Sequence, residues 1–267
     1  MMISEKSKDY LWLHLRDLPY FRAMLRAIEA AFYQGIDLPA PILDLGCGDG
    51  HFASVAFDYL LDVGLDPWAG PIHEARQYGA YKLLIQGDGA HMPFPEAFFG
   101  SAVSNSVLEH IPNIEAVLNE TARVLKPGAT FVFCSPNHNF LSSLSIGRSL
   151  DNLRLRRLGD GYRAFFNRIS RHQHCDPPEV WEQRLEQAGF HLERHWSYFP
   201  PETMRVFEWG HYFGLPSLIC KKLTGRWNLA RRRWNFWLTE RLVRKHYQLK
   251  PRQDGSMTFY IARRVKR

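Results

Sequence analysis

The sequence lacks any uninterrupted apolar run of the roughly 18 residues that a membrane-spanning helix requires. Its first sixteen residues, MMISEKSKDYLWLHLR, carry charges throughout, which excludes the pattern of a secretory signal peptide. Internal repeats and low-complexity tracts are also absent from the sequence. We therefore expect a cytoplasmic, globular protein whose 267 residues, 45% of them hydrophobic, bury the core of one decorated domain.

Cysteine is scarce, and no two cysteines form a C-x-x-C pair. The chain has four of them, Cys47, Cys134, Cys175 and Cys220. This scatter excludes a disulfide framework and suits a reducing compartment, so we expect free thiols. The stretch HQHC at 172–175 contains metal-ligating residue types, but they crowd into one loop, whereas structural zinc sites usually combine two separated segments. We predict no metal site.

The net charge of +7 is unevenly distributed along the chain. Residues 138–175 carry +5 and residues 201–252 carry +9, which leaves −7 for the remainder. An acidic body with two basic segments is not typical of a uniformly basic nucleic-acid-binding domain. The pattern favours two basic insertions that lie close to a functional site.

Short apolar segments alternate with helical patterns along most of the chain. A helix is expected over about 10–34, inside an N-terminal helical segment 1–38, and the main domain is expected over 39–267. Strands are expected at 42–45, 61–66, 81–86, 100–106, 130–136, 190–198 and 256–264. Helices between successive strands require right-handed crossovers, so the sequence predicts an α/β fold with a doubly wound, mainly parallel sheet.

The first predicted strand runs into a glycine-rich turn, in the stretch PILDLGCGDGHF. A dinucleotide fingerprint G-x-G-x-x-G would need a third glycine where His51 stands, and the turn contains no Arg or Lys for a phosphate. Carboxylates instead stand at the ends of the first three strands: Asp44 just before the glycine turn, Asp66 at the end of the second strand and Asp88 at the end of the third. Acids at these points can accept hydrogen bonds from ribose hydroxyls and an adenine amino group, and they disfavour a polyphosphate. The pattern therefore favours a cationic or zwitterionic nucleoside.

Five stretches appear in order along the chain: LDLGCGDG, VGLDP, GDGAHMPFPEAFFG, SNSVLEHIPN and RVLKPGATFVF. With them the sequence resembles the class I S-adenosylmethionine-dependent methyltransferases, in particular the small-molecule, type 11 branch that includes the ubiquinone and menaquinone methyltransferases. The resemblance runs from about Ile42 to Asn137. It implies a seven-stranded Rossmann-like sheet of order 3-2-1-4-5-7-6 with the last strand antiparallel, and S-adenosyl-L-methionine as the cofactor.

The resemblance also implies roles for individual residues. Around the methionyl part it places Asp44, Gly46, Cys47, Gly48, Gly50 and Asn105. Asp66, followed by Pro67, would bind the ribose, and Asp88 with Gly89 would meet the adenine. Asp44 and Asp66 also have an ordinary structural interpretation, as carboxylates that cap turns.

Methyl transfer is an in-line displacement, so the main tasks of such a protein are alignment and the exclusion of water. An acceptor that is a hydroxyl or a carbon acid also needs a base. His110, which follows the fourth strand, and His174 are the candidates, although His110 could equally cap a helix. An acceptor that is already anionic needs neither histidine.

The two basic insertions, 138–175 and 201–252, leave the sheet at its carboxyl edge, where ligands bind in such folds. We expect them to form a cap that selects a small acceptor, anionic, amphipathic or lipid-linked. A stripe in the second insertion fits such a lid or a peripheral contact with an anionic membrane; it comprises Trp227, Ala230, Trp234, Trp237, Leu238 and Leu242. Alternatives are a stripe that packs on the core, or a non-catalytic or RNA-binding scaffold, since arginines and aromatics also interleave here. Binding of nucleic acid is the less favoured alternative.

Overall fold

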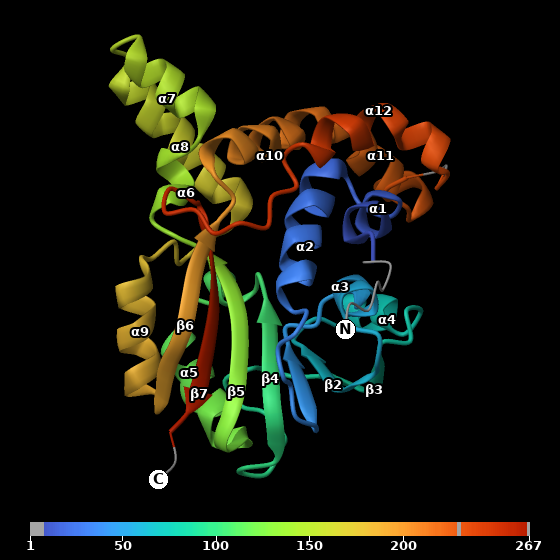
Figure 1. Ribbon diagram of the computed structural model, residues 1–267, viewed down its shortest axis with the longest axis vertical. Coiled ribbons are helices and arrows are strands. Elements are labelled where there is room, and N and C mark those ends of the chain that lie inside the picture. The colour runs from blue at the N-terminus through green and yellow to red at the C-terminus, as the bar shows by residue number, and fades with distance from the viewer. Residues whose placement is uncertain (1–7, 229–230, 266–267) are drawn as a thin grey trace, which may run out of the picture.

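A computed structural model describes residues 8–228 and 231–265, and seven strands form one sheet (Figure 1). The strands are β1 (Ile42–Leu45), β2 (Leu61–Asp66), β3 (Tyr81–Gln86), β4 (Phe99–Asn105), β5 (Leu125–Pro136), β6 (Phe190–Tyr198) and β7 (Met257–Arg264). Their order is β3-β2-β1-β4-β5-β7-β6, and β7 runs antiparallel to both of its neighbours. The predicted fold, order and direction are confirmed. β5 begins earlier than expected, because Leu125 pairs with Phe99 before the register shifts.

Helices cover both faces of the sheet. One face packs against α5 (Ile114–Val124) and α9 (Pro178–Gln187), and the other against α1 (Tyr10–Leu15), α2 (Tyr20–Phe32) and α3 (His51–Ala56). A short helix, α4 (Ala69–Ala75), connects β2 to β3. Successive residues of β5 serve opposite cores, with Phe131 and Phe133 on the α5 side and Val132 and Cys134 on the α2 side. This two-sided burial explains why the strands read as continuous apolar runs.

The helical pattern expected over 10–34 is present, but it divides into two helices, α1 and α2. Pro19 stands at the N-cap of α2 and has no backbone N–H with which to continue the preceding turn. The break lets α1 and α2 run in different directions (Figure 1).

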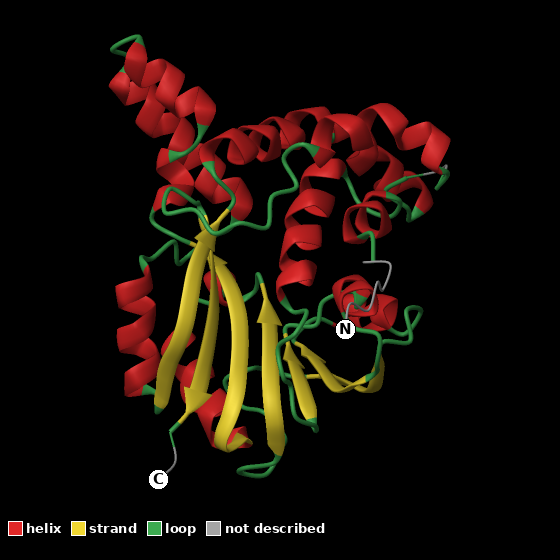
Figure 2. Cartoon of the chain, in the orientation of Figure 1, coloured by secondary structure: helices red, strands yellow, loops and turns green. Residues whose placement is uncertain are grey.

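The two basic insertions fold as helices above the carboxyl ends of the parallel strands (Figure 2). The first contains α6 (Asn139–Ser142), α7 (Ser145–Asn152) and α8 (Arg156–Ser170); the second contains α10 (Pro201–Phe213), α11 (Leu215–Thr224) and α12 (Arg233–Arg244). Glu208 joins them, since its buried carboxylate accepts hydrogen bonds from Ser145, Ile146 and Tyr162. Among the described residues, no helix is long and apolar enough to cross a bilayer.

The expected helical stripe of the second insertion is only partly present. Trp227 lies in the loop before α12, and Ala230 falls outside the described residues. The other four members, Trp234, Trp237, Leu238 and Leu242, lie on α12 and are more than half exposed. The stripe therefore does not pack on the core.

A buried carboxylate fastens α2 to the sheet. Glu29 is fully buried and accepts hydrogen bonds from Asn105 at the end of β4 (2.7 Å), Tyr198 at the end of β6 (3.0 Å) and Ser106 (3.1 Å). The guanidinium of Arg26, one turn earlier on α2, lies 3.1 Å from the same carboxylate. Each group compensates the desolvation of the other.

We predict that Glu29→Ala lowers the free energy of unfolding by about 3–5 kcal/mol, because it leaves the charge of Arg26 buried without its partner. Urea titration monitored by circular dichroism measures this change. Glu182→Ala, at an exposed position of α9, serves as the control and should change stability by less than about 0.5 kcal/mol. Equal stabilities for the two variants would contradict the prediction.

Candidate functional site

A cavity of about 680 Å³ opens at the carboxyl ends of β1, β2 and β4. The turn between β1 and α3 forms its floor, and Gly46, Gly48 and Gly50 all have positive φ there, at +77°, +56° and +75°. A Cβ on Gly46 would lie 2.4 Å from Val107, whereas a Cβ on Gly48 would meet nothing within 4 Å. The turn thus needs glycine for its backbone, and at Gly48 the main chain faces open space that a ligand can occupy.

Asp66, at the end of β2, is held in a fixed orientation on this floor. One carboxylate oxygen accepts the N–H of Gly48 at 3.0 Å and the other accepts the N–H of Trp68 at 2.9 Å. Burial raises the pKa of Asp66, and these two N–H groups counteract part of the rise. Each oxygen retains a lone pair for a hydroxyl donor in the cavity.

Asp44, on β1, accepts a hydrogen bond from the hydroxyl of Tyr81 at 2.6 Å. Burial raises the pKa of Asp44 to about 7; the Tyr81 bond lowers it, and the nearby charge of Asp66 raises it further. Sequence reasoning missed Tyr81. Its signal is a tyrosine at the start of β3, the strand beside β2 in the sheet.

Gly50 is not among the residues that line this cavity, and a Cβ there would lie 3.0 Å from that of Ala75. The other five expected ligand-binding residues do line it. They are Cys47, Pro67, Asp88, Gly89 and Asn105. Asp88 is largely exposed and orders its loop by accepting the N–H of Ala90 at 2.9 Å. The amide of Asn105 is already engaged, since it donates to Glu29 and accepts from the thiol of Cys134.

Residues that the sequence analysis did not single out for the site complete the cavity wall. Leu18, Arg22 and Arg26 come from the N-terminal helical segment, while Lys221 and Trp227 come from the second insertion. The sequence does contain a sign of the role of α2. Arg22, Arg26 and Glu29 form one charged stripe on a helix that is otherwise apolar. Lys221 of α11 also bonds Glu74 of α4 at 3.0 Å, which closes one side of the cavity.

A second cavity of about 1020 Å³ lies beside the first, between α2 and the two insertions. Both cavities are lined by Arg22, Arg26, Trp68, Ser106, His110 and Trp227. The first insertion contributes residues 167–173, and the second contributes residues of α10 and α11 together with Trp227. Segments far apart in sequence therefore meet in one two-chambered space at the carboxyl edge of the sheet.

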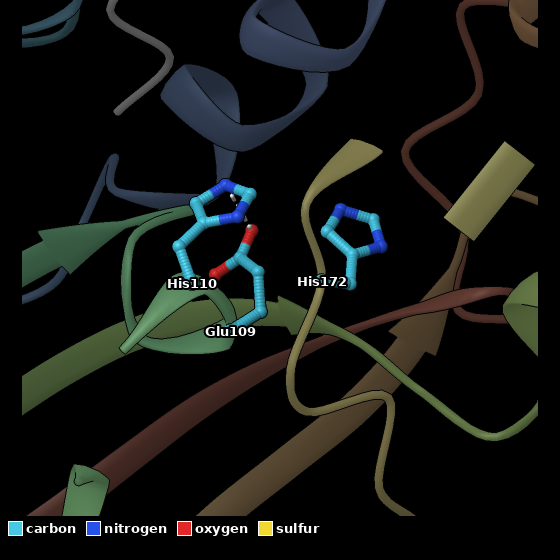
Figure 3. A group of neighbouring side chains, drawn as sticks. All are labelled: Glu109, His110 and His172. Carbon is cyan, nitrogen blue, oxygen red and sulfur yellow. Dashed lines mark ion pairs between the residues drawn. The ribbon is translucent and has the colours of Figure 1, made fainter. Parts of the chain in front are cut away.

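Figure 3 shows Glu109 and His110 close to one another, with His172 beside them on a neighbouring segment. Glu109 and His110 belong to the 3-10 helix η1 (Leu108–His110), and His172 follows α8. The Nδ1–H of His110 donates to the carbonyl oxygen of Arg171 at 3.1 Å, which leaves Nε2 as the acceptor; Nε2 lies 3.8 Å from a carboxyl oxygen of Glu109. Burial lowers the pKa of His110, and the charges of Arg26 and Arg171 lower it further. A lowered pKa favours the neutral imidazole, which can accept a proton.

Candidate ligand atoms of Glu109, His110 and His172 lie within 4.8 Å of one another, the spacing of a metal site. The charges around them disfavour this interpretation. The guanidinium of Arg26 acts on both Glu109 and His110, and that of Arg171 acts on His110. Repulsion from Arg171, whose guanidinium has no carboxylate partner among the described residues, opposes a divalent cation here.

His174, the other candidate base, is not among the residues that line either cavity. Its Nε2 lies 2.9 Å from the carbonyl oxygen of Ile111, and its Nδ1 lies 3.4 Å from a carboxylate oxygen of Asp176. Both nitrogens therefore face protein groups. This arrangement suits a residue that fastens the 171–176 segment to η1.

Known proteins resemble this chain in both sequence and fold. Residues 43–133 match a family described as a methyltransferase domain. The sterol 24-C-methyltransferase of Aspergillus fumigatus is 27% identical over 76% of this chain and 59% of its own length. The malonyl-[acyl-carrier protein] O-methyltransferase of Yersinia pestis is 32% identical over 39% of each chain. The chain thus spans less than two thirds of the length of these curated relatives.

Among solved structures, a methyltransferase of Thermotoga maritima that depends on S-adenosylmethionine superposes with a TM-score of 0.54. The two chains are 14% identical, and the alignment covers 96% of this chain and 93% of that one. Identity this low speaks for the shared fold alone.

The buried carboxyl of Glu109 generates a prediction about pH. Burial raises its pKa from 4.5 to about 8, and its Oε2 has no hydrogen-bond partner. Between pH 4.5 and pH 8 the carboxyl of Glu109 is protonated in the folded protein and ionised in the unfolded chain. The contribution of Glu109 to the free energy of unfolding is therefore lost as the pH rises. We expect the difference in free energy of unfolding between Glu109→Gln and the parent protein to shift in favour of Glu109→Gln by at least about 1 kcal/mol when the pH rises from 5 to 8.5.

Urea unfolding at the two pH values measures this gain. Glu182→Gln, exposed on α9, is the matched control and should follow the parent protein at both pH values. If Glu109→Gln and the parent protein change in parallel, Glu109 ionises normally and the prediction is wrong.

Proposed function

We propose that the protein transfers a methyl group from S-adenosylmethionine to a small acceptor, because residues 43–133 match a methyltransferase domain family. The observation that carries the proposal is the fixed carboxylate of Asp66 beside the open backbone of Gly48. A sulfonium nucleoside needs a carboxylate for its ribose and no cation for a phosphate. Asp66 supplies the carboxylate, and the glycine turn beside it contains no Arg or Lys.

The residues of the first cavity fit this cofactor. Asp66 would accept hydrogen bonds from the ribose hydroxyls, and Asp88 with Gly89 lies where the adenine would be placed. Asp44, Gly46, Gly48 and Asn105 would surround the methionyl part. Trp68, which is 70% exposed at the cavity rim, offers a ring that a bound purine could cover.

Bound S-adenosylmethionine supplies an electrophilic methyl group. The tasks left to the chain are alignment of the two reactants and exclusion of water. The shared wall at Ser106 and His110 is where an acceptor in the second cavity would approach the first. Ser106 adopts a positive φ of +52°, a strained conformation that the bonds of Asn105 and Ser106 to Glu29 stabilise.

For an acceptor with a proton to lose, we propose His110 as the base, because its ring lines both cavities and its Nε2 is unprotonated. The position of His174 outside both cavities leaves it in a positioning role. Both insertions contribute walls to the second cavity, in keeping with a cap that selects an anionic or amphipathic acceptor.

Ion pairs of the second insertion count against the alternative of an RNA-binding scaffold. Arg231 pairs with Asp17 at 3.1 Å, and Arg233 and Arg244 pair with Asp9 at 2.6 and 2.8 Å. These cations fasten the insertion to α1 and are not free for phosphates. The absorbance ratio of the purified protein discriminates, because retained nucleic acid would favour the scaffold.

We also propose that the outer surface of α10–α12 contacts an anionic membrane, from which a lipid-linked acceptor would be taken. The exposed apolar side chains of this surface are Trp209, Phe213, Ile219, Leu223, Trp234, Trp237, Leu238 and Leu242. Trp209, Phe213 and Leu242 border one groove of about 590 Å³ between α10 and α12. Cations without a carboxylate partner among the described residues accompany them at Arg205, Lys222, Arg232, Arg241 and Lys245. Such a combination is typical of interfacial binding.

Asp66→Ala should weaken binding of S-adenosylhomocysteine by about 2–4 kcal/mol, because it removes two charge-assisted hydrogen bonds to the ribose. Titration calorimetry measures the loss, and Asp37→Asn, at an exposed position before β1, is the control.

NADH should not bind the parent protein. Unchanged affinity in Asp66→Ala, or binding of NADH in preference to S-adenosylhomocysteine, would overturn the assignment of the first cavity.

For the membrane contact, we expect the protein to sediment with vesicles that contain phosphatidylglycerol and not with neutral phosphatidylcholine vesicles. The double variant Trp234→Ser/Trp237→Ser should lower the partition coefficient at least tenfold, about 1.4 kcal/mol. Tyr59→Ser/Leu83→Ser removes two exposed apolar side chains elsewhere and should have no effect. Equal losses in both double variants would refute a specific face.

A further inference from the structure

The second cavity is lined by an unusual excess of cationic side chains. Four arginines line it, Arg22, Arg26, Arg168 and Arg171, together with three histidines, His110, His172 and His211. Glu109 is the single carboxylate among these lining residues, and it is buried. Charges of one sign in a cavity favour a ligand group of the other sign.

Among the residues that the structure describes, a carboxylate pairs with one of the four arginines. Arg26 pairs with Glu29 and donates to the carbonyl oxygen of Asn105. The guanidinium groups of Arg22, Arg168 and Arg171 have neither an ion pair nor a hydrogen bond to another described residue; Arg22 lies over the ring of Trp227 at 5.6 Å. Arg22 and Arg171 are exposed at the cavity wall and have no carboxylate partner among the described residues, so their guanidinium groups are available to a bidentate oxyanion.

Two of these unpaired charges act on the histidines of the cavity. After burial, the guanidinium of Arg22 contributes to the lowered pKa of His211, and that of Arg171 contributes to the lowered pKa of His110. Both arginines line the cavity from its solvent-exposed side. The two residues come from α2 and from the C-cap of α8, so they approach from different elements.

Apolar side chains make up much of the remaining wall. They are Phe21, Leu25, Phe207, Leu218, Trp227 and Met257. A fully polar metabolite would leave this surface without contacts, whereas an apolar body would cover it. The wall and the arginines together describe a ligand with one oxyanion and an apolar body.

We propose that Arg22 and Arg171 form a binding subsite for a carboxylate or phosphate group of the acceptor, whose apolar body lies against Phe207 and Trp227. The inference rests on the proposed function, because it defines the acceptor that the second cavity takes. It makes Arg22 and Arg171 determinants of specificity, on a helix and an insertion outside the matched methyltransferase segment. Arg171 lines only the second cavity, so its role is separable from cofactor binding.

The test uses simple probes on the full-length protein saturated with S-adenosylhomocysteine. Octanoate and octyl phosphate carry the expected oxyanion on an apolar chain, and 1-octanol is the uncharged analogue. By titration calorimetry, both anions should bind at least tenfold more tightly than 1-octanol. A preference between octanoate and octyl phosphate then identifies which oxyanion the subsite fits.

Arg171→Gln should weaken octanoate and octyl phosphate binding at least tenfold and leave the affinity for S-adenosylhomocysteine unchanged. Arg22→Lys, which keeps the charge but loses the planar fork, should weaken them by a smaller factor. Arg157→Gln, at an exposed position of α8 outside both cavities, is the matched control and should bind like the parent protein.

Equal binding of octanoate and 1-octanol, or unchanged octanoate binding in Arg171→Gln, would overturn the subsite. If the parent protein does not bind S-adenosylhomocysteine, the proposed function is overturned instead. The two failures are therefore distinguishable in the same set of titrations.

Discussion

Burial of the Glu29 carboxylate is the constraint on which the site depends. A charge inside a protein must be compensated, and Glu29 is compensated by groups from β4, β6 and its own helix. These bonds fix the rotation of α2 above the sheet. As a result, Arg26 and Arg22, one and two turns before Glu29, face the carboxyl edge where the cavities lie. The same bonds hold Asn105 and Ser106 in the wall that the two cavities share.

The two cavities differ in their balance of charge. Five carboxylates line the first against Arg22, Arg26 and Lys221, whereas four arginines line the second against the one carboxyl group of Glu109. A cationic cofactor and an anionic acceptor would thus each meet complementary charge and be brought together at Ser106 and His110. Because these charged side chains are already in position, the protein does not have to rearrange its charges when the reactants meet.

The insertions use their cations in three different ways. Some fasten the insertion to the N-terminal helices, as Arg233 and Arg244 do through Asp9. Others, such as Arg171, line the second cavity, and a third group lies on the exposed face of α10–α12 beside tryptophans and leucines. A net charge by itself cannot distinguish these uses, because only the position of each carboxylate decides which cations remain free.

The sequence by itself determined the sheet, its order through the family resemblance, and the glycine turn with its carboxylates. These are local properties: apolar runs specify strands, and a tight turn of positive φ specifies glycine. The tertiary structure alone decided that α2 forms a wall of the site, that Tyr81 bonds Asp44, and that His110 lines the cavities while His174 does not. It also decided which arginines are neutralised, since ion pairs such as Arg231 with Asp17 join residues more than two hundred positions apart. Long-range packing sets these contacts, and no local pattern of residues encodes them.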